Sequence, residues 1–234
     1  MLAARLSEDA SCRVGLLEAG GMPDDPDIAA GDRVHAANLW PDNLPGWRET
    51  LIAYYDAMER LSDAMLRAFA LALALPEDWF QGFYRKPLTQ INMIHYPPHP
   101  AHTPGRQFGL RPHADTTAFT ILAQGDEEGL QVEHGEDWIE VPPIQGTFVI
   151  NIGDMMARWT NDRFASTPHR VINRSGRERF SIAFFAIPDF DAVVACVPGC
   201  AASGQSAKYP PLHVGRFMLN SNATDWNEDG PVAR

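Results

Sequence analysis

Hydrophobic spacing predicts one long helix in the first half of the chain. Between Pro45 and Leu75 the apolar side chains recur at intervals of three and four residues. This spacing places them on one face of an α-helix, and Pro76 ends the pattern. We interpret the stripe as core packing. Its members are Leu51, Tyr54, Tyr55, Met58, Leu61, Met65, Phe69 and Ala72.

The pattern then changes to short runs rich in β-branched and aromatic residues, separated by Gly, Pro, Asp and Asn. Many short strands at regular spacing favour an antiparallel sandwich or barrel, the jelly-roll type included. The predicted strands are Gln90–Tyr96, Phe108–Leu110, Thr117–Leu122, Leu130–Val132, Trp138–Val141, Thr147–Ile152, Arg170–Ile172 and Arg179–Ile187.

Four zones follow from these patterns. Residues 1–30 are an atypical N-terminal segment that ends in an acidic stretch rich in Gly and Pro. Residues 31–87 are a helical region with the one long helix, and residues 88–196 form the β-rich core. Residues 197–234 are a C-terminal extension, which we expect to be rich in loops because its periodicity is weak.

Composition and charge exclude several classes of partner. With 19 Lys and Arg against 30 Asp and Glu, the 234-residue chain has a net charge of -11. We therefore expect neither nucleic acid nor an anionic membrane as partner. No apolar stretch approaches the length of a spanning helix. Three cysteines and an acidic start without a signal-peptide pattern favour the cytoplasm. No pattern indicates an oligomeric state.

Two histidines and one aspartate form a candidate metal site. On extended backbone, residues two apart project from the same face, so His113 and Asp115 present an imidazole and a carboxylate to one point. His169, from a later predicted strand, supplies a third ligand. Two imidazoles and one carboxylate on one face leave open coordination positions, as in non-haem Fe(II) oxygenases.

A second pair of side chains suits a carboxylate ligand. Arg179 and Ser181 share one face of a predicted strand shortly after His169 and offer a guanidinium and a hydroxyl. A dicarboxylate whose other end chelates the metal fits both features. Taken alone, Arg179 is also explained as a surface charge of a strand.

Together these motifs resemble the Fe(II)- and 2-oxoglutarate-dependent dioxygenases of the isopenicillin N synthase-like group. The resemblance extends from about Trp40 to about Ala192, roughly two thirds of the chain. Its carriers are His113–Asp115, Gly129–Val132, Trp138–Pro143, Phe148–Asp154, Trp159–Val171 and Arg179–Ser181.

The resemblance implies a double-stranded β-helix, or jelly-roll, core with flanking helices. It implies Fe(II) held by His113, Asp115 and His169, with 2-oxoglutarate as co-substrate held by Arg179 and Ser181. Tyr96 matches a tyrosine of the same pocket, although an aromatic at a strand end explains it equally well. Asn92 lies close to a position where some members place a polar or basic co-substrate residue.

The implied reaction is the oxidation of a small molecule by O2, by hydroxylation or desaturation, with release of succinate and CO2. An oxidase or ethylene-forming variant on the same iron site is an alternative, because fold and ligands do not determine the outcome. A truncated, catalytically silent β-barrel is another.

The front of the chain motivates that last alternative. Residues 1–28 resemble a fragment of a glucose-methanol-choline flavin oxidoreductase, but the Gly-x-Gly-x-x-Gly motif that cradles phosphate is absent. We therefore expect no flavin. The segment is interpreted as a fusion or mis-started remnant that takes the place of the family's first edge strand, which would leave backbone groups of the sheet unpaired.

Overall fold

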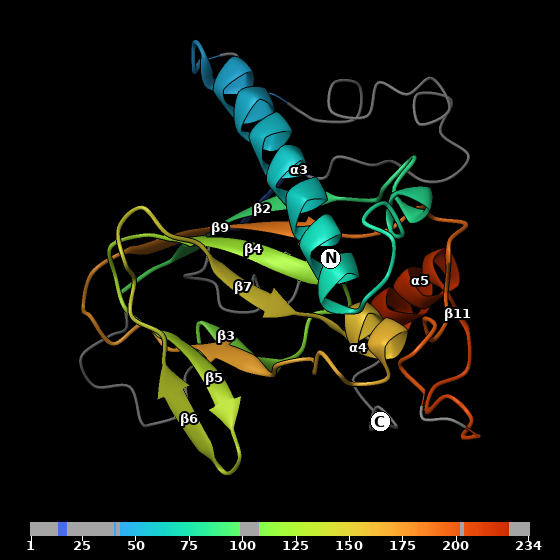
Figure 1. Cartoon of the computed structure of the whole chain (residues 1–234). Coiled ribbons are helices and arrows are strands. Elements are labelled where there is room, and N and C mark those ends of the chain that lie inside the picture. Colours follow the sequence, from blue (N-terminus) through green and yellow to red (C-terminus); the bar gives the residue numbers. More distant parts are fainter. Residues whose placement is uncertain (1–13, 18–39, 41–42, 99–107, 202–203, 225–234) are drawn as a thin grey trace.

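Two antiparallel sheets face each other in the computed structural model, which describes residues 14–17, 40, 43–98, 108–201 and 204–224 (Figure 1). The larger sheet has the order β1-β2-β9-β4-β7 and the smaller sheet the order β3-β8-β5-β6. A short pair, β10-β11, lies apart from them. The larger sheet comprises β1 (Val14–Leu17), β2 (Gln90–Tyr96), β9 (Arg179–Ala186), β4 (Phe119–Gln124) and β7 (Val149–Ile152). The smaller sheet comprises β3 (Leu110–His113), β8 (His169–Val171), β5 (Leu130–His134) and β6 (Asp137–Glu140), and the short pair β10 (Val193–Val194) and β11 (Leu212–His213).

Helices cover the outer face of the larger sheet and one end of the double sheet (Figure 1). The long helix α3 (Trp47–Ala72) crosses the outer face of the larger sheet, and α4 (Asp154–Thr160) and α5 (Val214–Thr224) lie together at one end (Figure 1). A single 3-10 turn, η1 (Gln81–Phe83), follows α3. The architecture is the mainly β, jelly-roll class that the sequence predicts.

Strand β9 is the centre of the larger sheet and sorts its side chains between two environments. It pairs with β2 on one side and with β4 on the other. Residues Arg179, Ser181 and Ala183 point between the two sheets, whereas Phe184 points outward and packs on Tyr55 of α3, with ring centroids 5.9 Å apart. One strand therefore contributes both to the hydrophobic core and to the interior of the barrel.

The predicted helix is present with slightly shorter limits. It begins after Gly46, whose φ of 77° is the left-handed conformation that glycine adopts without strain. It ends at Ala72, before Pro76, where the turn closes with a hydrogen bond from the Leu75 amide to the Ala70 carbonyl at 2.9 Å. Its buried stripe packs against the larger sheet. The stripe differs in part from the predicted one, because Ala72 is exposed whereas Leu66 and Ala70 are buried.

Two helices lie where none was predicted. Helix α4 begins two residues after the predicted strand Thr147–Ile152, and five of its seven residues are buried. A short helix buried almost all round has no amphipathic period, so the pattern could not indicate it. Beyond residue 197, where we expected loops, β11 and α5 occur, and Leu212 and Val214 belong to the main core.

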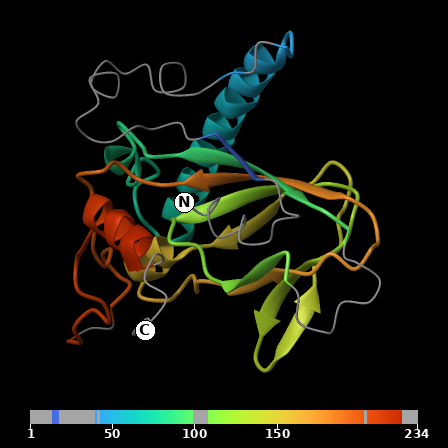
Figure 2. The same cartoon turned by 180° about the vertical axis from the view of Figure 1, so that it is seen from behind.

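The expectation of a missing edge strand is wrong. Strand β1 pairs antiparallel with β2 over four residues, from Val14 opposite Ile94 to Leu17 opposite Ile91, and lies at the edge of the larger sheet (Figure 2). The outer backbone groups of β2 are therefore paired there. The other residues of the 1–28 segment lie outside the described residues.

Packing of α3 on the sheet yields a stability prediction. Leu66 is 3% exposed within the core, whereas Leu71, on the same helix, is 61% exposed. Replacing Leu66 by Ala is expected to lower the free energy of unfolding by about 2–5 kcal/mol, because it removes buried methyl groups and leaves a cavity. Urea unfolding measures this. Leu71→Ala is the matched control, expected within about 0.5 kcal/mol of the parent. Equal effects of the two substitutions would contradict the packing of this helix face.

Candidate active site

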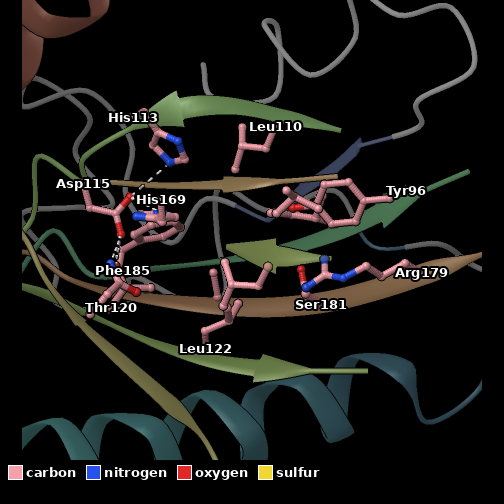
Figure 3. A pocket seen from close by; sticks show the side chains of 15 residues that line it. Tyr96, Leu110, His113, Asp115, Thr120, Leu122, His169, Arg179, Ser181 and Phe185 are labelled. Carbon is pink, nitrogen blue, oxygen red and sulfur yellow. Dashed lines mark hydrogen bonds and ion pairs between the residues drawn. The ribbon is translucent and has the colours of Figure 1, made fainter. Parts of the chain in front are cut away.

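A pocket of about 400 Å³, counting space open to solvent, lies between the two sheets (Figure 3). His113, Asp115 and His169 line one end of it. Arg179 and Ser181 lie toward the other end, with Tyr96 across from them (Figure 3). The wall between is apolar and comes from both sheets: Ile94, Leu110, Leu122, Leu130, Val171, Ala183 and Phe185.

The three candidate metal ligands come from the smaller sheet and the loop that leaves it. His113 ends β3, His169 begins β8 opposite it, and Asp115 lies in the loop toward β4. One potential ligand atom from each residue lies within 4.8 Å of the other two. Among the described residues this is the one such group of His, Cys, Asp and Glu. The spacing of a divalent ion's ligands is thus available without rearrangement of the backbone.

A bulge in β3 decides which of its side chains enter the pocket. Leu110 pairs with Val171 and His113 pairs with His169, so the span on β3 is one residue longer than the span on β8. Leu110 and His113, three residues apart, therefore both line the pocket. Strict alternation would instead have placed Arg111 beside His113, yet Arg111 is exposed.

Backbone carbonyls determine which nitrogen of each imidazole faces the metal site. Nδ1 of His113 lies 2.9 Å from the Arg111 carbonyl, and Nδ1 of His169 lies 3.1 Å from the Thr167 carbonyl. Because a carbonyl only accepts, each Nδ1 carries the proton and donates. In the neutral form of each imidazole, Nε2 then carries the lone pair, and the two Nε2 atoms lie 3.5 Å and 3.8 Å from Oδ1 of Asp115. Metal-binding histidines in proteins are oriented in this way.

Two neutral side chains hold the carboxylate of Asp115. The Thr120 hydroxyl and the Asn151 amide donate to Oδ2 at 2.5 Å and 2.6 Å. Oδ1 is left facing the two imidazoles. Thr120 was not identified from the sequence, and Asn151 was interpreted there as a strand residue only. Both contacts depend on the pairing of β4 with β7, where Thr120 lies opposite Asn151.

Burial and mutual attraction set the protonation of the three groups. Burial alone raises the pKa of Asp115, but hydrogen bonds from Thr120 and from protonated His113, together with the charges of the two histidines when protonated, outweigh burial, and the pKa lies well below its usual range. Burial lowers the pKa of His113, but attraction to Asp115 outweighs burial and raises it. For His169 burial prevails, and its pKa is lowered. Asp115 is thus ionised, in the form that binds a cation.

The start of α4 fixes the loop that carries Asp115. The Asp154 amide donates to the Asp115 carbonyl at 2.8 Å, and the Met155 amide donates to the Thr117 carbonyl at 3.0 Å. Gly153 permits this approach. A Cβ atom there would lie 2.2 Å from the Thr117 carbonyl oxygen and 2.9 Å from that of Asp115.

At the other end of the pocket, Arg179 is a buried cation without a carboxylate. Its exposed fraction is 0%, and its guanidinium lies over the Tyr96 ring, 4.8 Å from the centroid. Nη2 donates to Oε1 of Gln124 at 3.2 Å, whereas Nε and Nη1 have no partner among the described residues. Burial lowers the pKa of Arg179, although Tyr96 opposes that shift. The guanidinium therefore fits an anion arriving in the pocket.

Of the candidate residues, Asn92 alone does not line this pocket. It lies on the interior face of β2 with Ile94 and Tyr96, opposite Ala183 of β9. Its exposed fraction is 0%, and neither amide atom has a partner among the described residues. Its role toward the co-substrate stays a prediction.

Comparison with known proteins identifies the family. A family model described as the 2OG-Fe(II) oxygenase superfamily matches residues 87–188, the segment from which every pocket-lining residue comes. The chain belongs to this superfamily. The family uses Fe(II) and 2-oxoglutarate, and its double-stranded β-helix core is the fold seen here.

Relatives with curated names are longer than this chain. A 2-oxoglutarate-Fe(II) type oxidoreductase, hxnY, of Emericella nidulans is 39% identical over 183 residues, covering 76% of this chain and 52% of its own. Kihadalactone A synthase LFS of Citrus sinensis is 34% identical over 212 residues, covering 84% of this chain and 61% of its own. The chain thus spans between half and two thirds of these two relatives.

Solved structures agree with the fold. A full-length Neurospora crassa protein, crystallised in complex with alpha-KG, superposes with a TM-score of 0.76 at 30% identity, covering 81% of this chain and 61% of its own. JOX2 in complex with 2OG, Fe and JA gives a TM-score of 0.72 at 33% identity, covering 77% of this chain and 54% of JOX2.

The resemblance of residues 1–28 to a flavin oxidoreductase is not borne out, since these relatives are oxygenases and β1 belongs to the oxygenase sheet. Within the described ranges, none of the helices combines the length and the apolar character needed to cross a membrane.

The steric role of Gly153 yields a prediction about metal binding. Gly153→Ala pushes the Thr117 and Asp115 carbonyls away and displaces the Asp115 carboxylate, so the affinity for Fe(II) or Co(II) is expected to fall by about 10–100-fold, as when support around a metal ligand is lost. Anaerobic calorimetric titration measures it. Gly82→Ala is the control, because nothing lies within 4 Å of a Cβ there. Parental affinity in Gly153→Ala would contradict the proposed support.

Proposed function

We propose that this chain is an Fe(II)- and 2-oxoglutarate-dependent dioxygenase that oxidises a small molecule, by hydroxylation or desaturation, with release of succinate and CO2. One observation carries the proposal. A single pocket holds two histidines and an ionised aspartate at one end. Toward its other end lies the buried guanidinium of Arg179, whose Nε and Nη1 have no hydrogen-bond partner among the described residues. A 2-keto dicarboxylate is the ligand class that complements both.

The donor set fits Fe(II). His113 and His169 would offer Nε2, and Asp115 would offer Oδ1, each already oriented by a hydrogen bond on its other polar atom. Bound iron supplies the oxidation chemistry, because three protein ligands leave positions for co-substrate and O2. The chain's own residues keep these ligands neutral or anionic as required and exclude water with the apolar wall.

The opposite end fits the distal carboxylate of 2-oxoglutarate. Nη1 of Arg179 would donate to it, and the buried hydroxyl of Ser181, two residues along the same face of β9, would add a further donor. The Tyr96 ring supports the plane of the guanidinium. Charge-assisted hydrogen bonds in a site without bulk water are strong, so this end would select a dicarboxylate over a monocarboxylate.

The remaining partners are a small-molecule substrate and O2. The net charge of -11 argues against nucleic acid as substrate. We also propose that the chain works in the cytoplasm, where a reducing environment keeps iron as Fe(II); the free thiols of Cys196 and Cys200 agree with that.

Anaerobic titration of the metal-free chain with Fe(II) and then 2-oxoglutarate tests the function. The visible charge-transfer band of an iron-chelated 2-keto acid is expected to appear and to saturate at one equivalent of each. In His113→Ala the band and iron-dependent turnover are expected to be lost, because the ligand group loses one of three donors. Iron binding without the band would move the assignment toward an oxidase, and absence of iron binding would favour the silent β-barrel.

Arg179 carries the prediction for the co-substrate. Arg179→Leu is expected to weaken 2-oxoglutarate binding by about 2 kcal/mol, roughly 30-fold in Kd, because charge-assisted hydrogen bonds in a buried site are lost. Fe(II) affinity is expected to remain at the parental value. Titration of the iron-loaded variant at the charge-transfer band measures both. Arg174→Leu, the same change at an exposed position, is the control, and equal 2-oxoglutarate affinity in the two variants would move the co-substrate site elsewhere.

A further inference from the structure

We propose that Gln124 is a positioning residue for the co-substrate: it holds the Arg179 guanidinium by a neutral contact and so preserves its full positive charge for the distal carboxylate. This inference rests on the proposed function. It deepens that function by assigning the preference for a dicarboxylate over a monocarboxylate to a residue that lies beyond the pocket lining.

The register of the larger sheet brings Gln124 to the guanidinium. Gln124 is the last residue of β4 and pairs with Ser181 of β9, so it lies next to the two residues that face the co-substrate end. Its Oε1 accepts a hydrogen bond from Nη2 of Arg179 at 3.2 Å.

A second contact determines the orientation of the Gln124 amide. Its Nε2 donates to the carbonyl of Val141 at 3.2 Å. A carbonyl cannot donate, so the amide nitrogen must face Val141 and the amide oxygen must face Arg179. The Val141 backbone is itself held by its amide, which donates to the Leu130 carbonyl at 2.9 Å. Gln124 therefore connects Arg179 to the smaller sheet through contacts that permit one arrangement.

Gln124 is uncharged, so its contact does not neutralise the positive charge of Arg179. In the part of the chain that the structure describes, no carboxylate lies within 4.0 Å of the guanidinium, although Arg179 is completely buried. Buried arginines are normally paired with an acid. A glutamate here would satisfy the same N–H but would cancel the charge before any ligand arrived. An amide satisfies it and leaves the charge intact.

The directions of the contacts leave a defined face for the ligand. Nη2 donates to Gln124 and the guanidinium lies over the Tyr96 ring, while Nε and Nη1 have no hydrogen-bond partner among the described residues. The end of the guanidinium that carries Nη1 is therefore open to the carboxylate of a ligand, which a charge-assisted hydrogen bond would hold. A positively charged, oriented guanidinium favours a ligand with a distal carboxylate. A 2-keto acid without one gains nothing from it.

Two substitutions of Gln124 distinguish the effect of its neutral charge from the effect of its hydrogen bond to Arg179. In the full-length, Fe(II)-loaded chain, Gln124→Glu is expected to raise the Kd of 2-oxoglutarate at least about tenfold, because a second anion now faces the ligand's carboxylate. Binding of pyruvate, a 2-keto acid that lacks the distal carboxylate, is expected to stay within about twofold of the parent. Gln124→Leu, which removes the tether and keeps the charge, is expected to lie between parent and Gln124→Glu.

The measurement is anaerobic titration of both keto acids at the charge-transfer band, with Fe(II) affinity determined first. Gln145→Glu, which adds the same charge at an exposed loop position, is the matched control and is expected to bind both ligands as the parent does. Unchanged 2-oxoglutarate affinity in Gln124→Glu would overturn the inference, as would an equal loss for both keto acids, which indicates general damage. A parent chain that binds Fe(II) but neither keto acid would overturn the proposed function itself.

Discussion

A buried, ionised carboxylate is the constraint on which this structure depends. Asp115 lies inside the barrel with Oδ2 held by two hydrogen bonds and Oδ1 facing two imidazoles, and an ionised group in such a place is tolerated only when hydrogen bonds and opposite charges surround it. Thr120 and Asn151 must therefore lie opposite each other on β4 and β7, and the loop must be held by α4. The arrangement of the metal end of the pocket follows from the need to keep the Asp115 carboxylate ionised in the interior of the barrel.

The opposite end of the pocket meets the same requirement for a cation. Arg179 is buried at least as completely as Asp115, and its partner Gln124 is as neutral as Thr120 and Asn151. Strand β9 connects the two ends, because it pairs with both β2 and β4 and directs alternate side chains inward along the pocket. The length of a ligand that bridges the metal site and the guanidinium is set by how β9, which carries Arg179, lies against the smaller sheet and the loop that carry the three metal ligands.

Much of this could be predicted from the sequence where local spacing decides the outcome. The spacing of two residues predicted that His113 and Asp115 meet, although Asp115 lies in the loop after β3, and the strand limits of Gln90–Tyr96 were predicted without error. Spacing failed where neighbours come from another strand. Gln124 and Thr120 are ordinary strand residues in the sequence, and only the pairing of β4 with β9 and β7 gives them partners. The bulge that turns Leu110 inward is invisible to alternation for the same reason.

The neutral partner of Arg179 implies that anion binding and stability are coupled at this end of the pocket. The guanidinium is oriented by Gln124, and burial lowers its pKa, so the folded state bears part of its desolvation penalty until an anion enters. A fixed carboxylate in place of the amide would have offset that penalty in the folded protein and left the site less able to bind an anion. The Gln124 amide retains the geometry without that compensation, and the corresponding free energy becomes available to an anionic ligand when it binds.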